Sequence, residues 1–282
     1  MGINRQTYYR TIKATNHKRQ IATQVVALVE AIRMRMPRIG TRKLYHLLYD
    51  ELRELGVGRD RLFDILKANH LHIVPKRQYH ITTDSHHRFR KHKNLIDGLE
   101  IKRPEQVWVS DITYIGSREN PMYLALVTDA YSKKIAGANV SSSLNASGAI
   151  AALKEAIKNR KYPDNRIIHH SDRGLQYCCD EYQKLLNKHR LVCSMTESYD
   201  PYQNAIAERV NGILKNEFIL GIKIQDLNLM KKLVDQSIEI YNNERPHWSC
   251  WMNTPATMHN QQTIKIKTYK TKNSTKVIPS AI

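Results

Sequence analysis

The sequence predicts an α/β protein in which a mixed sheet with flanking helices follows a small all-helical region. Three observations predict this class. Apolar side chains recur at helical spacing within residues 1–75, short apolar runs begin at residue 105, and helical segments alternate with the later runs. A chain of 282 residues also has room for about two domains.

Three helices are expected within residues 1–75. The first is expected over 20–36 and ends before Gly40, while Thr41 can cap the second and a turn at Gly58 precedes the third. The expected inward-facing side chains are Val25, Val26, Val29, Ile32, Leu44, Leu47, Leu48, Leu52, Leu62, Ile65 and Leu66. Such a unit fits either a helix-turn-helix-like DNA-binding domain or an ordinary three-helix bundle, and only its charge favours DNA.

Residues 76–104 are expected to form a basic linker, after which the sequence pattern changes. Strands are predicted at 107–115, 123–128, 134–140, 167–170 and 191–195. Helices are predicted at 145–160, near 180–189 and from residue 204 onward. This order of elements predicts a mixed sheet with helices on its faces. We therefore expect an α/β domain over 105–260 and a basic tail over 261–282.

The formal charge of +19 is distributed unevenly along the chain. Residues 1–104 contain 22 Lys and Arg against 9 Asp and Glu, for +13, whereas residues 105–260 contain 18 against 17, for +1. Residues 261–282 add five lysines and no acid. Basic segments on both sides of a nearly neutral core indicate nucleic-acid binding. A solvated basic face explains the charge less well, because +13 is confined to one third of the chain. A membrane surface is also less well supported, since no basic amphipathic helix with aromatic anchors is visible.

Composition excludes several classes of protein. Hydrophobic residues make up 41% of the chain, which is enough for a core and excludes disorder throughout. No run approaches the roughly 18 apolar residues of a membrane span, and the first residues lack a signal-peptide core. The four cysteines form no CxxC pair and the histidines of 76–104 lack metal-ligand spacing, so neither a disulfide scaffold nor a zinc site is expected. We expect a cytoplasmic protein with a polyanionic partner and no small-molecule cofactor.

Basic side chains in the helical region and the linker are candidate phosphate contacts. They are Arg42, Lys43, Arg59 and Arg61 in the helices, and Arg88, Arg90 and Lys91 in the linker. Arg173, in the α/β domain, is a further candidate.

Three acids stand at positions where catalytic carboxylates are expected. Asp111 interrupts a strand-like run, Asp172 follows a predicted strand at its carboxyl end, and Glu208 lies on a predicted helix. Carboxylates that converge from different elements can hold the two Mg²⁺ ions of a phosphodiester-cleaving site, because hard cations prefer oxygen ligands. Position alone is weak support, since other acids could be nominated on similar grounds: Asp129, Asp164, Asp180 and Glu217.

One face of the last predicted helix carries polar residues. Asn204, Glu208, Asn211 and Lys215 follow one another at helical spacing. Lys215 lies two turns, about 10 Å, beyond Glu208, which is too far for a metal ligand but suitable for a DNA phosphate. The alternative is a solvated lysine in a helix-surface ion pair. We expect Asn204, Asn211 and Lys215 to form one DNA-facing surface.

The sequence segments that contain these acids indicate a function more specifically than the positions of the acids do. The segments are WVSDITYI (108–115), HSDRGLQY (170–177), NAIAERVNGILKNE (204–217) and YNNERPHWSCWMNTP (241–255). They resemble the signatures of DDE transposases of insertion-sequence family three, whose catalytic core is similar to that of retroviral integrases. Thirty-five residues separate Asp172 from Glu208, which is the D-D-35-E spacing, and Lys215 follows Glu208 by seven. The helical N-terminal region also resembles that family's helix-turn-helix-like domain.

The resemblance implies an RNase H-like fold with strand order 3-2-1-4-5. Asp111 would lie on the central first strand, Asp172 after the fourth, and Glu208 on a late helix, with all three binding two Mg²⁺ or Mn²⁺ ions. The implied reaction is phosphoryl transfer on DNA, in which water cuts a transposon end and the liberated 3′-hydroxyl attacks a second phosphodiester. The implied partners are double-stranded transposon ends, target DNA and further copies of the chain, in a bacterial cytoplasm and associated with the nucleoid.

Two other functions stay open at this point. One is a metal-dependent DNA nuclease that uses the same acids without joining strands. The other is a catalytically idle DNA-binding repressor of transposition. None of these functions requires a Ser or Tyr nucleophile, so Tyr114 and Ser171 are assigned packing or hydrogen-bonding roles.

Overall fold

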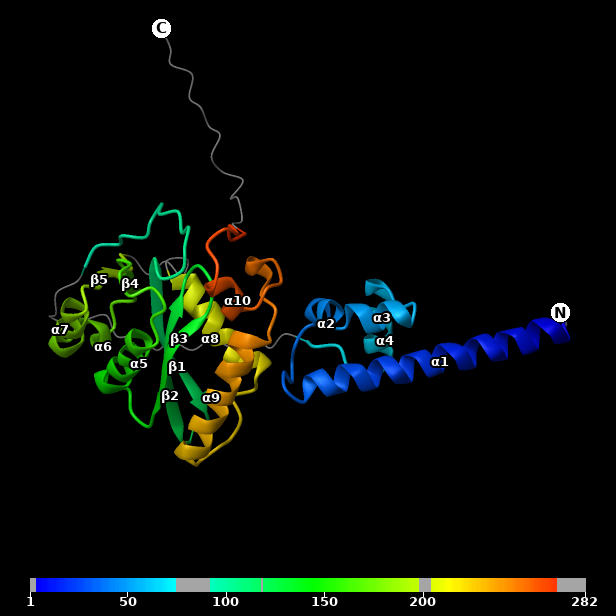
Figure 1. The fold of residues 1–282 in the computed structure, drawn as a ribbon. Coiled ribbons are helices and arrows are strands. Elements are labelled where there is room, and N and C mark those ends of the chain that lie inside the picture. Colours follow the sequence, from blue (N-terminus) through cyan, green and yellow to red (C-terminus); the bar gives the residue numbers. More distant parts are fainter. Residues whose placement is uncertain (1–3, 75–91, 118, 198–203, 268–282) are drawn as a thin grey trace, which may run out of the picture.

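An N-terminal helical unit precedes the α/β core in the computed structural model, which describes residues 4–74, 92–117, 119–197 and 204–267 (Figure 1). The helical unit contains α1 (Arg5–Arg33), α2 (Thr41–Leu47), α3 (Tyr49–Glu54) and α4 (Arg59–Ala68). The described part of the linker begins at residue 92, so Arg88, Arg90 and Lys91 lie outside the described residues.

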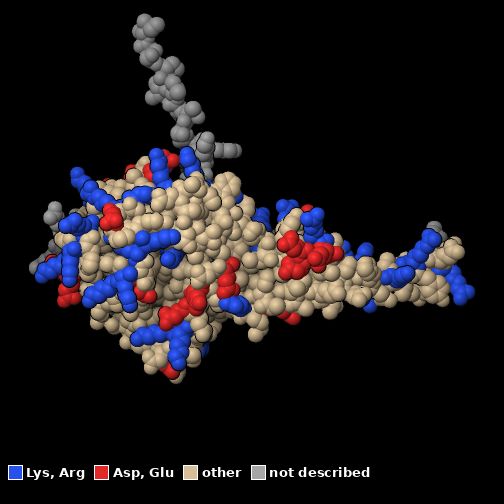
Figure 2. Space-filling model, in the orientation of Figure 1, with Lys and Arg blue, Asp and Glu red and all other residues tan. Residues whose placement is uncertain are grey.

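Helix α1 is longer than the sequence pattern predicts, because it begins at Arg5 rather than near residue 20. Residues 4–20 are all exposed, and the buried face begins only at Ile21. The first half of α1 therefore projects from the fold (Figure 1) and carries five cations and no acid. The charged side chains visible along this stretch in Figure 2 are basic. Apolar periodicity could not predict this half, since it has no core to face.

The second predicted helix is divided into α2 and α3 at Leu48, where the backbone leaves the helical region (φ −105°, ψ 23°). The prediction that Thr41 caps this helix is wrong. Gly40 is the N-cap, and Thr41 is the first helical residue with only 6% of its surface exposed. The predicted inward faces are confirmed in their main residues, since Val25, Val29, Leu44, Leu48, Leu52, Leu62, Ile65 and Leu66 are buried.

The core contains one five-stranded sheet with the order β3-β2-β1-β4-β5, which confirms the expected topology. Its strands are β1 (Val107–Gly116), β2 (Pro121–Asp129), β3 (Ile135–Ser141), β4 (Ile168–Ser171) and β5 (Val192–Met195). The first three are antiparallel neighbours, and β4 and β5 join parallel to β1 and to each other. Strand β1 is thus the central strand of a mixed sheet.

Helices cover both faces of this sheet, as Figure 1 shows. One face packs against α5 (Ala146–Lys158), α6 (Leu175–Cys178) and α7 (Asp180–Lys188). The other packs against α8 (Ala205–Glu217) and α9 (Leu227–Asn243). Side chains alternate between the faces along β2, where Ala125 and Val127 face the first layer and Leu124 and Leu126 the second. A Cβ at Gly137 would lie 2.2 Å from the carbonyl oxygen of Ala152, so only glycine lets β3 approach α5 this closely.

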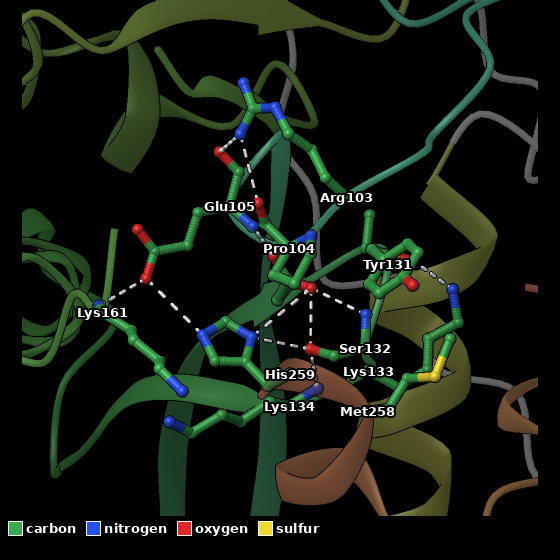
Figure 3. A network of polar contacts seen from close by, with 12 residues as sticks. Arg103, Pro104, Glu105, Tyr131, Ser132, Lys133, Lys134, Lys161, Met258 and His259 are labelled. Carbon is green, nitrogen blue, oxygen red and sulfur yellow. Dashed lines mark hydrogen bonds and ion pairs between the residues drawn. The ribbon is translucent and has the colours of Figure 1, made fainter. Parts of the chain in front are cut away.

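A buried polar network holds the C-terminal part of the core against the residues around β1 and β2 (Figure 3). It involves the short helix α10 (Pro255–His259), which follows a 3-10 turn at Trp248–Cys250. The His259 ring lies 3.5 Å from Oε1 of Glu105 and 3.8 Å from Oδ1 of Asp129, and its Nδ1 is 3.0 Å from Oγ of Ser132. Burial alone would lower the pKa of His259, but hydrogen bonds to Asp129 and Glu105 outweigh it and raise that pKa.

None of the helices within the described residues combines the length and apolarity needed to cross a lipid bilayer.

Candidate active site

Asp111 lies on the central strand β1, on the face covered by α8. Val107 and Val109 pack against Ala207 of α8, and the two-residue alternation of a strand places Asp111 on the same face. Its Oδ2 accepts a 2.7 Å hydrogen bond from Nδ2 of Asn211, and its Oδ1 accepts one of 2.9 Å from its neighbouring backbone N–H. The carboxylate is therefore held from both the strand and the helix.

Asp172 follows β4 and lies beside Asp111. The parallel register pairs Val109 with His170, so the residues two positions further along both strands lie at the same level. Oδ1 of Asp172 accepts a 3.0 Å hydrogen bond from the backbone N–H of Gly174. A Cβ at Gly174 would lie 3.0 Å from that same oxygen, so the glycine leaves room for this turn. Asp111 and Asp172 line one small pocket.

The electrostatics of this pocket favour a bound cation. Burial raises the pKa of Asp111 to about 7, and the negative charges of Asp172 and, more weakly, Glu208 act in the same direction. Two neighbouring carboxylates repel each other, and a cation bound between them removes this repulsion. Oxygen ligands of this kind are those that Mg²⁺ and Mn²⁺ prefer, so the donor set fits such an ion.

Glu208 lies in the first turn of α8, three residues before Asn211. Its side chain is exposed, and partial burial raises its pKa. Among the described residues, no three His, Cys, Asp or Glu side chains are close enough to hold one metal ion. The structure therefore brings Asp111 and Asp172 together in one pocket, whereas Glu208 does not line that pocket.

The expected polar stripe on α8 divides into two parts. Asn204 and Asn211 are buried and donate to β1, Asn204 through Nδ2 to the carbonyl oxygen of Ser110 at 3.2 Å. Their amides hold the helix on the sheet, which corrects the expectation of one continuous DNA-facing surface. Lys215 is half-buried; burial lowers its pKa, and the charge of Asp111 opposes that effect. No acid of the described residues pairs with Lys215 within 4 Å, and Asp111 is the acid whose charge acts on its ammonium.

The other candidate DNA contacts differ in their surroundings. Lys43 is not on an open surface, because its Nζ lies 3.4 Å from Oε1 of Glu217 and only 17% of its side chain is exposed. Arg42 is exposed, and Arg59 is exposed beside Asp60 at 2.9 Å. Arg61 donates to the carbonyl oxygen of Gly56 at 3.2 Å, and Arg173 is half-buried directly after Asp172.

The four other acids that the sequence could nominate either have structural partners or are exposed to solvent. Asp129 is fully buried and accepts hydrogen bonds from the backbone N–H of Glu105 at 2.7 Å and from Ser132 at 2.7 Å. Glu217 is paired with Arg245 and Lys43. Asp164 and Asp180 are exposed. None of these four acids lines the pocket that holds Asp111 and Asp172.

Sequence reasoning missed three residues of this site. Gly174, Gln176 and Tyr177 line the same pocket as the two aspartates. All three belong to the segment HSDRGLQY, which is one of the segments that resemble the family signatures. Their residue types, however, do not indicate which of them line the pocket beside Asp111. The role of Asn211 as the hydrogen-bond donor to Asp111 was likewise not predicted.

The strand order, the central aspartate and the second aspartate after β4 define an integrase-type catalytic core. Residues 101–201 match the family Integrase core domain, and a second family with the same description matches residues 189–255. The chain of a simian T-cell lymphotropic virus intasome, solved by cryoEM in complex with PP2A regulatory subunit B56 gamma, is similar in fold. Its TM-score is 0.50 at 18% identity, over 82% of this chain and 78% of that chain.

Relatives in bacteria are more similar in sequence. The insertion element IS600 uncharacterized 31 kDa protein of Shigella sonnei is 32% identical over 252 residues, which is 87% of this chain and 91% of that protein. Transposase InsF for insertion sequence IS3fB of Escherichia coli (strain K12) is 38% identical over 159 residues, and the matched region spans 55% of its length and 56% of this chain. The chain belongs to the IS3 family of insertion-sequence transposases.

Proposed function

We propose that this transposase cuts the ends of its DNA element and joins them to target DNA, with Asp111, Asp172 and Glu208 as the catalytic acids. The observation that carries the proposal is the pairing of Asp111 and Asp172 in one pocket of an integrase-type core. Glu208 lies on α8, whose next turn donates to Asp111 through Asn211, and its charge acts on Asp111, so it is the acid proposed to complete the set.

We propose that these three acids would hold two divalent ions, Mg²⁺ or Mn²⁺. When bound, such ions activate the attacking oxygen and neutralise charge on the phosphodiester. The side chains of this protein supply the rest. Asn211 orients Asp111, Gly174 orients Asp172 through its backbone N–H, and Lys215 adds a positive charge beside the acids for a DNA phosphate.

No protein nucleophile is assigned. Ser171 donates its hydroxyl to the carbonyl oxygen of Asp172 at 3.0 Å, and the Tyr114 ring packs on Tyr123 with 4.8 Å between centroids. Both residues therefore have structural partners. Strand joining proceeds by direct attack of the 3′-hydroxyl on the second phosphodiester, in which one P–O bond forms as another breaks.

DNA is the proposed partner of the basic segments on both sides of the core. Residues 1–75 are the proposed DNA-binding domain, residues 76–104 and 261–282 are proposed basic straps, and residues 105–260 form the catalytic domain. Two DNA ends must be brought together for the joining step, so the working form is proposed to contain more than one copy of the chain.

A strand-transfer assay with labelled transposon ends tests the proposal. A transposase gives cleaved ends and joined products in Mg²⁺ or Mn²⁺, and neither with Ca²⁺ or a chelator. Cleavage without joining would support a nuclease instead. A DNA complex without cleavage would support a catalytically idle repressor.

A further inference from the structure

Glu217, the last residue of α8, ends the segment NAIAERVNGILKNE but has no role in the proposed chemistry. Its carboxylate forms a bidentate pair with Arg245, at 2.8 Å from Oε2 to Nε and 2.8 Å from Oε1 to Nη2. Only 2% of the Arg245 side chain is exposed, so this guanidinium is almost completely removed from solvent. A buried bidentate pair fixes both partners in position and in angle.

The helical unit contacts the same residue. Nζ of Lys43, in α2, lies 3.4 Å from Oε1 of Glu217, and the backbone N–H of Arg38 donates to the carbonyl oxygen of Glu217 at 3.0 Å. The side chain of Arg35 also pairs with Glu244, one residue before Arg245. One residue at the end of α8 thus accepts from the helical unit and from the core.

Helix α8 connects this junction to the catalytic acids. Glu208 precedes Glu217 by nine residues, or about 13 Å along the helix axis, and lies on the opposite face. Asn211 lies between them and donates to Asp111. Because a helix of this length moves as a rigid element, a shift at its end changes the position of Glu208 relative to Asp111.

We propose that Glu217 is a positioning residue that couples the helical unit, when it is bound to DNA, to the catalytic helix α8. Lys43 is the connection on the helical side and Arg245 the connection on the core side. The inference rests on the proposed function, because it assigns Glu208 to the catalytic set. It also replaces the expected DNA contact of Lys43 with a contact inside the protein.

The charge balance at the junction supports this assignment. Burial, followed by the charge of Arg245, lowers the pKa of Lys43 to about 8, although Glu217 opposes the effect and the charge of Arg209 adds a smaller lowering. One carboxylate therefore pairs with two cations, at 3.4 Å from Lys43 and 2.8 Å from Arg245, and it is the group that favours the charged form of Lys43. The interaction is specific to this geometry rather than a general surface attraction.

The test compares three variants of the full chain. Lys43→Met removes the helical side of the junction and leaves the Glu217–Arg245 pair intact, and Lys43→Arg keeps a cation that can pair with the carboxylate. Lys67→Met, at an exposed position of α4, is the matched loss of one positive charge from the same unit. Transposon-end affinity, its salt dependence and the cleavage rate at saturating DNA are measured for each.

Coupling predicts that Lys43→Met binds ends within about twofold of the wild type but cleaves at least about tenfold more slowly at saturation. Lys43→Arg should recover most of the rate, and Lys67→Met should cleave at the wild-type rate at saturating DNA, whatever its effect on affinity. Weaker binding with a shallower salt slope and an unchanged rate in Lys43→Met would overturn the proposal and restore Lys43 as a DNA contact. A wild-type rate and affinity would also overturn it.

Asp111→Asn, measured in parallel, separates the coupling from the chemistry. Loss of cleavage in Asp111→Asn with full activity in Lys43→Met rejects the coupling and leaves the catalytic assignment intact. Full cleavage in Asp111→Asn rejects the catalytic assignment itself.

Discussion

Asn211 donates a 2.7 Å hydrogen bond from Nδ2 to Oδ2 of Asp111, which joins α8 to the central strand β1 beside the acid pair. The bond, together with the one from the backbone N–H of Ile112, fixes the orientation of the Asp111 carboxylate. It also explains why an asparagine that sequence spacing assigned to a DNA-facing stripe is buried against the sheet.

Asn211→Ala should weaken metal binding at the acid pair. Residues that orient metal ligands usually contribute about 10- to 100-fold to metal affinity or activity, so the Mn²⁺ concentration for half-maximal cleavage should rise in that range. A Mn²⁺ titration of end cleavage measures it. Asn216→Ala, at an exposed position on the same helix, is the control. An unchanged Mn²⁺ requirement in Asn211→Ala would remove its orienting role.

The projecting half of α1 should bind duplex DNA. Residues 4–20 are exposed and carry Arg5, Arg10, Lys13, Lys18 and Arg19 without an acid. Replacing Arg10 and Lys13 together with Gln should reduce the slope of log affinity against log salt by about 0.9 for each phosphate that these two cations neutralise. The exposed pair Lys231 and Lys232 on α9, replaced in the same way, is the control. Equal slopes in both double variants would assign DNA binding elsewhere.

Lys215→Ala should weaken binding to transposon ends and reduce the salt slope by about one unit, because the ammonium lies in the field of Asp111 where a phosphate must approach. Lys215→Arg should keep much of the function, since a phosphate accepts either cation. End binding across a salt series decides the matter. A salt slope in Lys215→Ala equal to that of the wild type would show that Lys215 does not contact a DNA phosphate.

The network around His259 should make stability depend on pH. Hydrogen bonds to Asp129 and Glu105 raise its pKa above the ordinary 6.5, so the folded state binds the proton more tightly than the unfolded state. The stabilisation is complete below the unfolded pKa and is lost as the pH rises through the folded pKa. His259→Gln should therefore lower the free energy of unfolding by about 1–3 kcal/mol at about pH 5.5, and by less at about pH 9.

Urea unfolding of the full chain at the two pH values measures this difference, with the exposed His46→Gln as the control. A decrease of equal size at both pH values would show that His259 contributes packing rather than a charged hydrogen bond.

The strand order and the meeting of Asp111 and Asp172 could be predicted from the sequence because both depend on local pattern. Asp111 interrupts an apolar strand, and Asp172 directly follows another. The sequence segments around both residues resemble the signatures of a known family, in the same order along the chain. The exposed start of α1 faces no core, and the pairing of Glu217 with Lys43 and Arg245 depends on which surfaces meet, so no periodicity encodes either. The same holds for Lys43 and Asn211, whose residue types suit DNA contact equally well. Their partners, Glu217 and Asp111, lie 174 and 100 residues away in the chain.

The most direct test of the acid pair is end cleavage and strand transfer by Asp111→Asn in Mg²⁺. The amide can still accept from Asn211, and it removes the repulsion with Asp172, so the variant should fold at least as stably as the wild type. We predict that transposon-end binding stays within about twofold while cleavage and joining fall by at least about a thousandfold. Cleavage at the wild-type rate by a folded, DNA-binding Asp111→Asn would contradict the assignment of this acid pair as the catalytic centre.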